Sequence, residues 1–162
     1  MILCLDEEFL AACTSTAVAQ SVASGIVSNT FYSLSSTYGI THTIHKYVNW
    51  TTPNSHTYGQ LVVTLSGVDP VTDGADIIIG VFGQSGGSAL GAAYGSRHCI
   101  VNGLTTSPTS ASVLLHEVSH LFGCGECSRY CVMNASNYST AWCTTGSPNC
   151  DTTMSNNRHK FD

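Results

Sequence analysis

Two histidines near residue 120 have the spacing of metal ligands, and a glutamate directly follows the first of them. His116 and His120 are four residues apart in a segment that we expect to be helical. Side chains four apart lie on one face of a helix, one turn apart, so both imidazoles can reach a single Zn²⁺. Glu117 is adjacent to the first ligand and can face a water bound to that metal. The segment therefore predicts a hydrolytic zinc site.

The residues after this pair bear on the third ligand, because a catalytic zinc needs three protein ligands and one open position. Gly123 can end the helix in a left-handed conformation and turn the chain back toward the metal. Glu126 follows three residues later, and its carboxylate is a competent zinc ligand, so we expect it to be the third one. The alternatives are the thiolate of Cys124 or Cys127, or no third protein ligand.

Two long helices are predicted to position these residues. The first extends from Ala17 to Tyr38, where apolar residues recur at helical spacing, and Gly39 would end it. The second carries the metal ligands and extends from Ser110, a candidate N-cap, to Phe122.

Short apolar runs rich in β-branched residues predict the strands of a sheet. They lie at residues 2–5, ending in an acidic turn, and at 40–50, 76–82 and 99–101; residues 61–65 suit either a short strand or the last turn of a helix. The fold class is therefore α/β (α+β): a mixed, twisted sheet packed on the two helices, followed by an irregular, cysteine-rich C-terminal part.

Length and charge exclude several classes of protein. The chain has 162 residues, which suits a single domain over 1–162. Its five Lys and Arg against ten Asp and Glu give a net charge of −5 and exclude a basic face for nucleic acid. No apolar run approaches the roughly 18–20 residues that span a bilayer. We expect a monomer whose partner is a peptide or protein substrate.

The motif residues resemble those of the metzincin clan of zinc endopeptidases. That clan has HExxHxxGxx followed by histidine or aspartate, and then a methionine in a tight turn. The matching positions here are His116, Glu117, His120, Gly123, Glu126 and Met133, with glutamate as the departure. The sequence also departs from some metzincins at Ala135, where those proteins have a tyrosine ligand two residues after the methionine.

Other segments extend the resemblance over most of the chain. Asp76 to Gly80 resembles the buried strand of reprolysin-type domains, and Gly91 to Tyr94 resembles their edge strand. The cysteine beside the third-ligand position and the turn Cys131-Val132-Met133 resemble archaemetzincins.

The resemblance implies a zincin-like fold and a zinc-dependent endopeptidase. Glu117 would act as general base toward a zinc-bound water, and Met133 would form the floor of the metal site. The main chain of the edge strand would bind an extended peptide substrate through Gly91, Ala92, Ala93 and Tyr94. The alternatives are a metzincin fold that retains zinc as a binding or structural module without turnover, and a zinc hydrolase that does not cleave peptides.

Eight cysteines in so short a chain suggest an oxidising compartment, and we expect secretion although the first residues lack the features of a signal peptide. The resemblance to reprolysins implies a disulfide from Cys99 to Cys143 or Cys150. The resemblance to archaemetzincins instead implies a second, structural zinc on Cys127, Cys131, Cys143 and Cys150. We favour disulfides, with few or no free thiols, because the cysteine spacing does not match the archaemetzincin pattern.

Overall fold

The computed structural model describes residues 1–53, 56–68, 74–84, 90–105, 109–145 and 149–162. These ranges contain five strands and five helices, which alternate along the first part of the chain. In order they are β1 (Ile2–Asp6), α1 (Glu7–Ala12), α2 (Thr16–Tyr38), β2 (Lys46–Trp50), α3 (Tyr58–Val68), β3 (Ile78–Phe82), β4 (Gly91–Tyr94), β5 (His98–Asn102), α4 (Ser110–Leu121) and α5 (Cys150–Asn157).

The strands form one mixed sheet in the order β2-β1-β3-β5-β4. Neighbours among β2, β1, β3 and β5 are parallel, whereas β4 pairs antiparallel with β5 at one edge. Every residue of β1 and β3 is buried, as expected of central strands covered on both faces. The mixed sheet predicted from sequence is thus confirmed, and β4 is its antiparallel edge.

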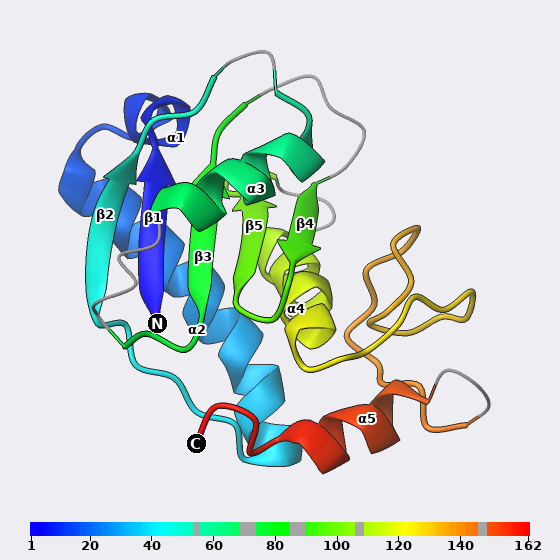
Figure 1. The fold of residues 1–162 in the computed structure, drawn as a ribbon. Coiled ribbons are helices and arrows are strands. Elements are labelled where there is room, and N and C mark those ends of the chain that lie inside the picture. Colours follow the sequence, from blue (N-terminus) through cyan, green and yellow to red (C-terminus); the bar gives the residue numbers. More distant parts are fainter. Residues whose placement is uncertain (54–55, 69–73, 85–89, 106–108, 146–148) are drawn as a thin grey trace.

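Helices cover both faces of the sheet (Figure 1). On one face, α2 and α4 pack over a core that includes Leu3, Ile79 and Val101. On the opposite face, α3 packs through Leu61 and Leu65 onto a second core. The sequence predicted two helices against the sheet; the third arises because residues 61–65, left open between strand and helix, lie within α3.

The long helix α2 begins and ends where its sequence indicates. The Ser15 hydroxyl accepts a hydrogen bond from the Val18 N–H, which caps the N-terminus. Gly39 has φ of +73° and ends the helix in the left-handed conformation that glycine adopts without steric cost. The long helix predicted from Ala17 to Tyr38 is therefore confirmed, starting one residue earlier.

The helix that carries the histidines, α4, is also confirmed, but its N-cap is Thr109 rather than Ser110. The Thr109 hydroxyl accepts from the Ser112 N–H at 3.2 Å, whereas the Ser110 hydroxyl donates to the Asn102 carbonyl at 2.7 Å. At the other end, Gly123 has φ of +96° and turns the chain away from the helix axis. This turn directs the following residues back toward the histidines.

The segment expected to be irregular contains α5. Its residues are mostly polar, so tertiary contacts stabilise it: Met154 is fully buried, and the Asn149 side chain accepts from the Thr152 N–H. The Asn157 amide donates to the Phe122 carbonyl at 2.8 Å, and the Lys160 ammonium donates to the Leu121 carbonyl. These bonds satisfy carbonyls at the C-terminus of α4 that have no partner within that helix.

Two smaller differences concern the first half of the chain. The acidic residues expected to form a turn after the first strand begin α1, because the Asp6 carboxylate accepts from the Phe9 N–H and caps that helix. The strand expected over residues 40–50 begins only at Lys46.

Part of the glycine-rich stretch before β4, residues 85–89, lies outside the described ranges. Among the described helices, none is long and apolar enough to cross a membrane.

Candidate metal centre

His116 and His120 lie on one face of α4, one helical turn apart. Their Nε2 atoms are 3.2 Å from each other, and the rings meet edge to face with centroids 4.8 Å apart. The distance is short enough for both nitrogens to contact one ion. The helical spacing alone accounts for this pairing.

Glu126 completes a triangle of ligand atoms. Its Oε1 lies 3.2 Å from Nε2 of His116 and 3.3 Å from Nε2 of His120. Bonds of 2.0–2.1 Å in tetrahedral geometry place any two ligand atoms about 3.3–3.4 Å apart. The three protein atoms therefore have the separations of one face of a zinc coordination tetrahedron.

Backbone carbonyls fix the orientation of both imidazoles. Nδ1 of His116 lies 2.8 Å from the Val132 carbonyl, and Nδ1 of His120 lies 2.8 Å from the Cys124 carbonyl. Since a carbonyl only accepts, each Nδ1 carries the proton and each neutral ring presents an unprotonated Nε2 to the centre. Burial lowers the pKa of His116 below its usual value. The hydrogen bond to the Val132 carbonyl and the charge of Glu126 oppose this shift.

This arrangement fits a cation. Two unprotonated ring nitrogens and a carboxylate oxygen are all acceptors, and without a positive charge between them their lone pairs repel. Nitrogen and oxygen ligands in a tetrahedral arrangement suit Zn²⁺. We therefore identify His116, His120 and Glu126 as a group able to hold a metal ion.

The centre is closed on the side of the helix and open on the side of Glu126. The side chain of His116 is 2% exposed and that of His120 is 24% exposed, whereas that of Glu126 is 59% exposed. A site with three protein ligands and an accessible fourth position is typical of catalytic zinc, because structural zinc is enclosed by four ligands.

Glu117 lies on α4 beside the first ligand and is 5% exposed. Burial, and secondarily the charge of Glu126, raises the pKa of Glu117 to about 8. Its Cγ is close to the edge strand: a Cβ built on Gly91 would lie 2.8 Å from it. The structure thus brings Glu117 and the first residue of β4 into direct contact.

The hydrogen-bond pattern of β4 shows which main-chain groups face its free edge. The Asn102 N–H donates to the Leu90 carbonyl at 2.8 Å, so this is a hydrogen-bonded pair of the antiparallel ladder. Hydrogen-bonded and non-hydrogen-bonded pairs alternate along an antiparallel ladder. The pairs Gly91–Val101 and Ala93–Cys99 are therefore non-hydrogen-bonded. The N–H and C=O groups of Gly91 and Ala93 therefore point away from β5, whereas those of Ala92 and Tyr94 point toward it.

The turn that contains Met133 is attached to the centre by backbone hydrogen bonds. The Asn134 N–H donates to the Cys131 carbonyl at 3.1 Å, which closes a tight turn over Val132 and Met133. The Met133 carbonyl accepts from the Cys127 N–H at 2.8 Å, next to Glu126. Met133 is fully buried in the core that includes α4, and its role as a floor for the metal stays a prediction.

One residue that the sequence did not single out lies against the ligands. The Tyr138 ring contacts the His116 ring edge to face, with centroids 5.5 Å apart. Burial, and then the charges of Glu117 and Glu126, raises the pKa of its phenol. Sequence comparison with some metzincins directs attention to position 135, which is alanine, and no pattern in the sequence marks Tyr138.

The two cysteines considered as alternative ligands face other partners. The Cys124 thiol is buried and lies 3.7 Å from the Cys150 carbonyl. The Cys127 sulfur lies 3.2 Å from that of Cys143, and both are at bonding distance from Cys131. Because one cysteine forms one disulfide, Cys131 has two alternative partners. The same three sulfurs also form a second group able to hold a metal ion.

The disulfide expected between Cys99 and Cys143 or Cys150 is wrong. Cys99 is fully buried in β5, on the face of the sheet covered by α4, and is a free thiol. Cys143 belongs to the sulfur cluster of the tail, and the free Cys150 thiol accepts from the Cys143 N–H at 3.1 Å. Cys13, Cys99, Cys124 and Cys150 are free thiols, so the expectation of few or none is also wrong.

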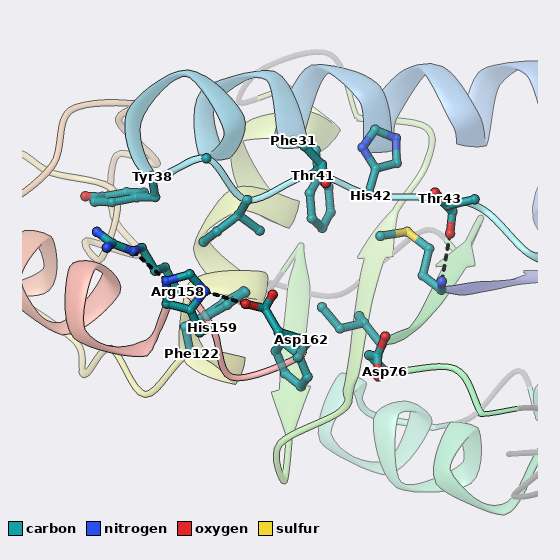
Figure 2. A pocket seen from close by; sticks show the side chains of 15 residues that line it. Phe31, Tyr38, Thr41, His42, Thr43, Asp76, Phe122, Arg158, His159 and Asp162 are labelled. Atoms are coloured by element: carbon teal, nitrogen blue, oxygen red, sulfur yellow. Dashed lines mark hydrogen bonds and ion pairs between the residues drawn. The ribbon is translucent and has the colours of Figure 1, made fainter.

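A cavity of about 340 Å³ lies elsewhere, between the end of α2, the N-termini of β1 and β3, and the end of the chain. Figure 2 shows Arg158, His159 and Asp162 linked in a row along its wall, opposite Phe31 and His42. None of the metal-ligand candidates lines it, so it is separate from the centre.

Comparisons with known proteins show the fold alone. No protein-family model and no curated protein matches the chain. A solved structure described as a chaperone-substrate complex superposes with a TM-score of 0.65 at 12% identity over 99% of this chain. The chain spans only 34% of that longer chain. A zinc-dependent peptidase from Methanocorpusculum labreanum has a TM-score of 0.48 at 13% identity, covering 95% of this chain and all of its own.

Proposed function

We propose that this chain is a zinc-dependent endopeptidase of the metzincin type, with His116, His120 and Glu126 as the zinc ligands. The observation that carries the proposal is the triangle of acceptor atoms with sides of 3.2–3.3 Å, presented by two histidines of fixed tautomer. When bound, zinc would polarise the scissile carbonyl and acidify a water.

Glu117 is the general base of the proposed reaction. Its ionised carboxylate would take a proton from the water and later give it to the leaving amine. Glu117 follows His116 on α4 and is within electrostatic range of Glu126, and its contact with β4 limits its movement.

The free edge of β4 would bind the substrate. An extended peptide can add to a sheet edge through main-chain hydrogen bonds, which do not depend on the peptide's sequence. The outward-facing groups belong to Gly91 and Ala93, and Ala92 and Tyr94 contribute only through their side chains. Since Gly91 also contacts Glu117, a peptide on this edge would lie next to the base.

The test combines metal analysis with peptide cleavage. The purified chain should hold zinc at its histidine site and cleave members of a peptide library, with fragments identified by mass spectrometry. Glu117→Gln should retain zinc and lose at least about 10²-fold in rate, because general-base loss costs 10²–10⁴-fold. Glu8→Gln, which removes a carboxylate on α1 instead, is the matched control and should stay active. Cleavage unaffected by Glu117→Gln would refute the mechanism.

The alternative of a zinc-retaining module without turnover gives a different result in the same experiment. The chain would then bind zinc but leave every peptide of the library intact.

Secretion and a monomeric state remain parts of the proposal. Size-exclusion chromatography with light scattering tests the monomeric state.

A further inference from the structure

Tyr138 has an unusual backbone conformation beside the candidate metal centre. Its φ is +44°, and among the described residues it is the one non-glycine with a positive φ. The Tyr138 N–H donates to the Asn134 carbonyl at 3.0 Å, which holds the residue at the end of a turn that begins next to Met133. Conformations of this kind persist where surrounding structure imposes them, and they concentrate at functional sites.

The Tyr138 side chain packs against a metal ligand. Its ring contacts His116 at an interplanar angle of 72°, the edge-to-face geometry that aromatic rings prefer. The side chain is half-buried, and within the described parts of the chain its hydroxyl makes no hydrogen bond. The strained backbone thus places the Tyr138 ring against the ligand candidate His116, and the hydroxyl has no partner among the described residues.

A donor of this kind would add to the stabilisation that zinc supplies in the proposed reaction. In peptide hydrolysis the scissile carbonyl oxygen gains negative charge in the transition state, and a positioned donor stabilises it. The side chains assigned to the centre provide acceptors: two unprotonated Nε2 atoms and the carboxylates of Glu117 and Glu126. Both Nδ1–H groups are already bonded to the Val132 and Cys124 carbonyls.

We propose that the Tyr138 hydroxyl donates a hydrogen bond to the scissile carbonyl oxygen as that oxygen becomes negative. The inference rests on the proposed peptidase function and adds a residue to it. The phenol keeps its proton throughout, and no bond to Tyr138 forms or breaks. Its contribution is confined to the transition state, because a neutral carbonyl accepts a weaker hydrogen bond than an oxyanion does.

The test removes the hydroxyl and keeps the ring. Tyr138→Phe should retain zinc, measured by mass spectrometry, and should keep KM within about threefold. Its kcat should fall about 10²–10³-fold, as observed when one oxyanion donor is lost. Tyr32→Phe removes a hydroxyl from an exposed tyrosine of α2 and should change neither value.

A binding measurement provides a readout independent of turnover. A phosphinic analogue of the cleaved peptide carries a tetrahedral anionic group in place of the reacting carbonyl. Its affinity, measured by calorimetry, should fall in Tyr138→Phe by about the same factor as kcat/KM. The affinity of the product peptide should not change.

Three results would overturn the inference, and they differ from one another. If Tyr138→Phe matches the wild type in kcat and analogue affinity, the hydroxyl is not the donor. If only Tyr138→Leu loses activity and zinc together, the ring acts by positioning His116. If the zinc-loaded wild type cleaves no peptide at all, the proposed function has failed and this inference fails with it.

Discussion

A Cβ atom on Gly91 would lie 2.8 Å from Cγ of Glu117, so the edge strand and the candidate base are in direct contact. The same Cβ would lie 2.8 Å from the Val113 side chain and 2.9 Å from the Ile100 carbonyl oxygen. The carbonyl belongs to the backbone of β5 and cannot move away by changing rotamer. Glycine at this position therefore allows β4 and α4 to approach each other.

Gly91→Ala should consequently lower activity without removing zinc. The added methyl group must displace the Glu117 side chain or shift β4, and a displacement of about 1 Å at a reacting group can cost 10²-fold in rate. Overpacking of this kind also destabilises by about 1–3 kcal/mol. Cleavage assays, zinc content and a denaturant titration measure the three effects.

The matched control is Gly25→Ala, in the middle of α2, where an added Cβ meets no atom within 4 Å. It should leave activity unchanged and stabilise the protein by about 0.5–1 kcal/mol, because alanine is the better helix former. Full activity in Gly91→Ala would show that the base tolerates the displacement and would contradict the tight coupling argued here.

Glu126 is the one proposed zinc ligand that lies outside α4, so helical spacing alone does not identify it. Loss of a residue that only supports a metal ligand lowers metal affinity 10–100-fold. Glu126→Ala removes a proposed ligand itself, so it should lower zinc affinity by more than this. Activity should fall in parallel, because two histidines alone seldom hold catalytic zinc. Glu126→His should preserve both if the turn after Gly123 adjusts. Competition with a chelator measures the affinity.

Unchanged zinc affinity in Glu126→Ala would move the third ligand to solvent or a cysteine. The control variant Glu7→Ala removes a carboxylate of α1, which accepts from the Thr52 N–H and lies outside the ligand group. Its zinc affinity should equal that of the wild type.

The sulfur cluster of the tail predicts a specific thiol count. Cys131 is at bonding distance from Cys127 and from Cys143, so an oxidised chain should contain one disulfide that involves Cys131. Alkylation of the denatured, unreduced protein should then label six of its eight cysteines. Intact-mass measurement counts the labels, and peptide mapping identifies the partner.

Eight labels together with a second equivalent of zinc would contradict the disulfide and favour metal binding by the three sulfurs. Cys143→Ser distinguishes the two forms further. It leaves Cys127 and Cys131 able to form a disulfide, whereas it removes one of only three ligands from the metal site. Zinc stoichiometry before and after the substitution gives the answer.

The parts of the site that sequence predicts depend on short-range geometry. His116, Glu117 and His120 lie within α4, and helical periodicity alone places their side chains together. Gly123 and Glu126 follow three and six residues after His120, and a left-handed glycine at position 123 indicates that the chain turns back. The sequence favours Ser110 as the N-cap and the structure has Thr109, because both residue types are good caps and tertiary contacts decide between them.

The parts that sequence does not predict depend on contacts between distant segments. The helix α5 has residues with weak helical preference, and its formation depends on Met154 burial and on bonds to the end of α4. The approach of Gly91 to Glu117 joins residues 26 positions apart through the sheet. Tyr138 reaches His116 only through the turns after Met133, which no local pattern specifies.

A last prediction concerns Asp6, a fully buried carboxyl group at the end of β1. Its Oδ1 accepts from the Phe9 N–H at 2.6 Å and from the Gly83 N–H at 3.1 Å, so it joins α1 to the end of β3. Burial raises its pKa from 3.8 to about 7; these hydrogen bonds oppose the rise, and the charges of Glu8 and Glu7 add to it.

Between about pH 4 and pH 7 the folded protein therefore keeps a proton on Asp6 that the unfolded chain has released. When the folded state binds more protons, stability falls as pH rises, by up to about 1.4 kcal/mol per unit for one group. Asp6→Asn cannot ionise and retains an oxygen that accepts both N–H groups, so its stability should fall less across this range.

Urea titrations from pH 4.5 to 8 with saturating zinc measure the difference. Asp162→Asn, exposed at the end of the chain, should keep the wild-type slope. Equal slopes in the wild type and Asp6→Asn would mean that Asp6 ionises normally in the folded protein.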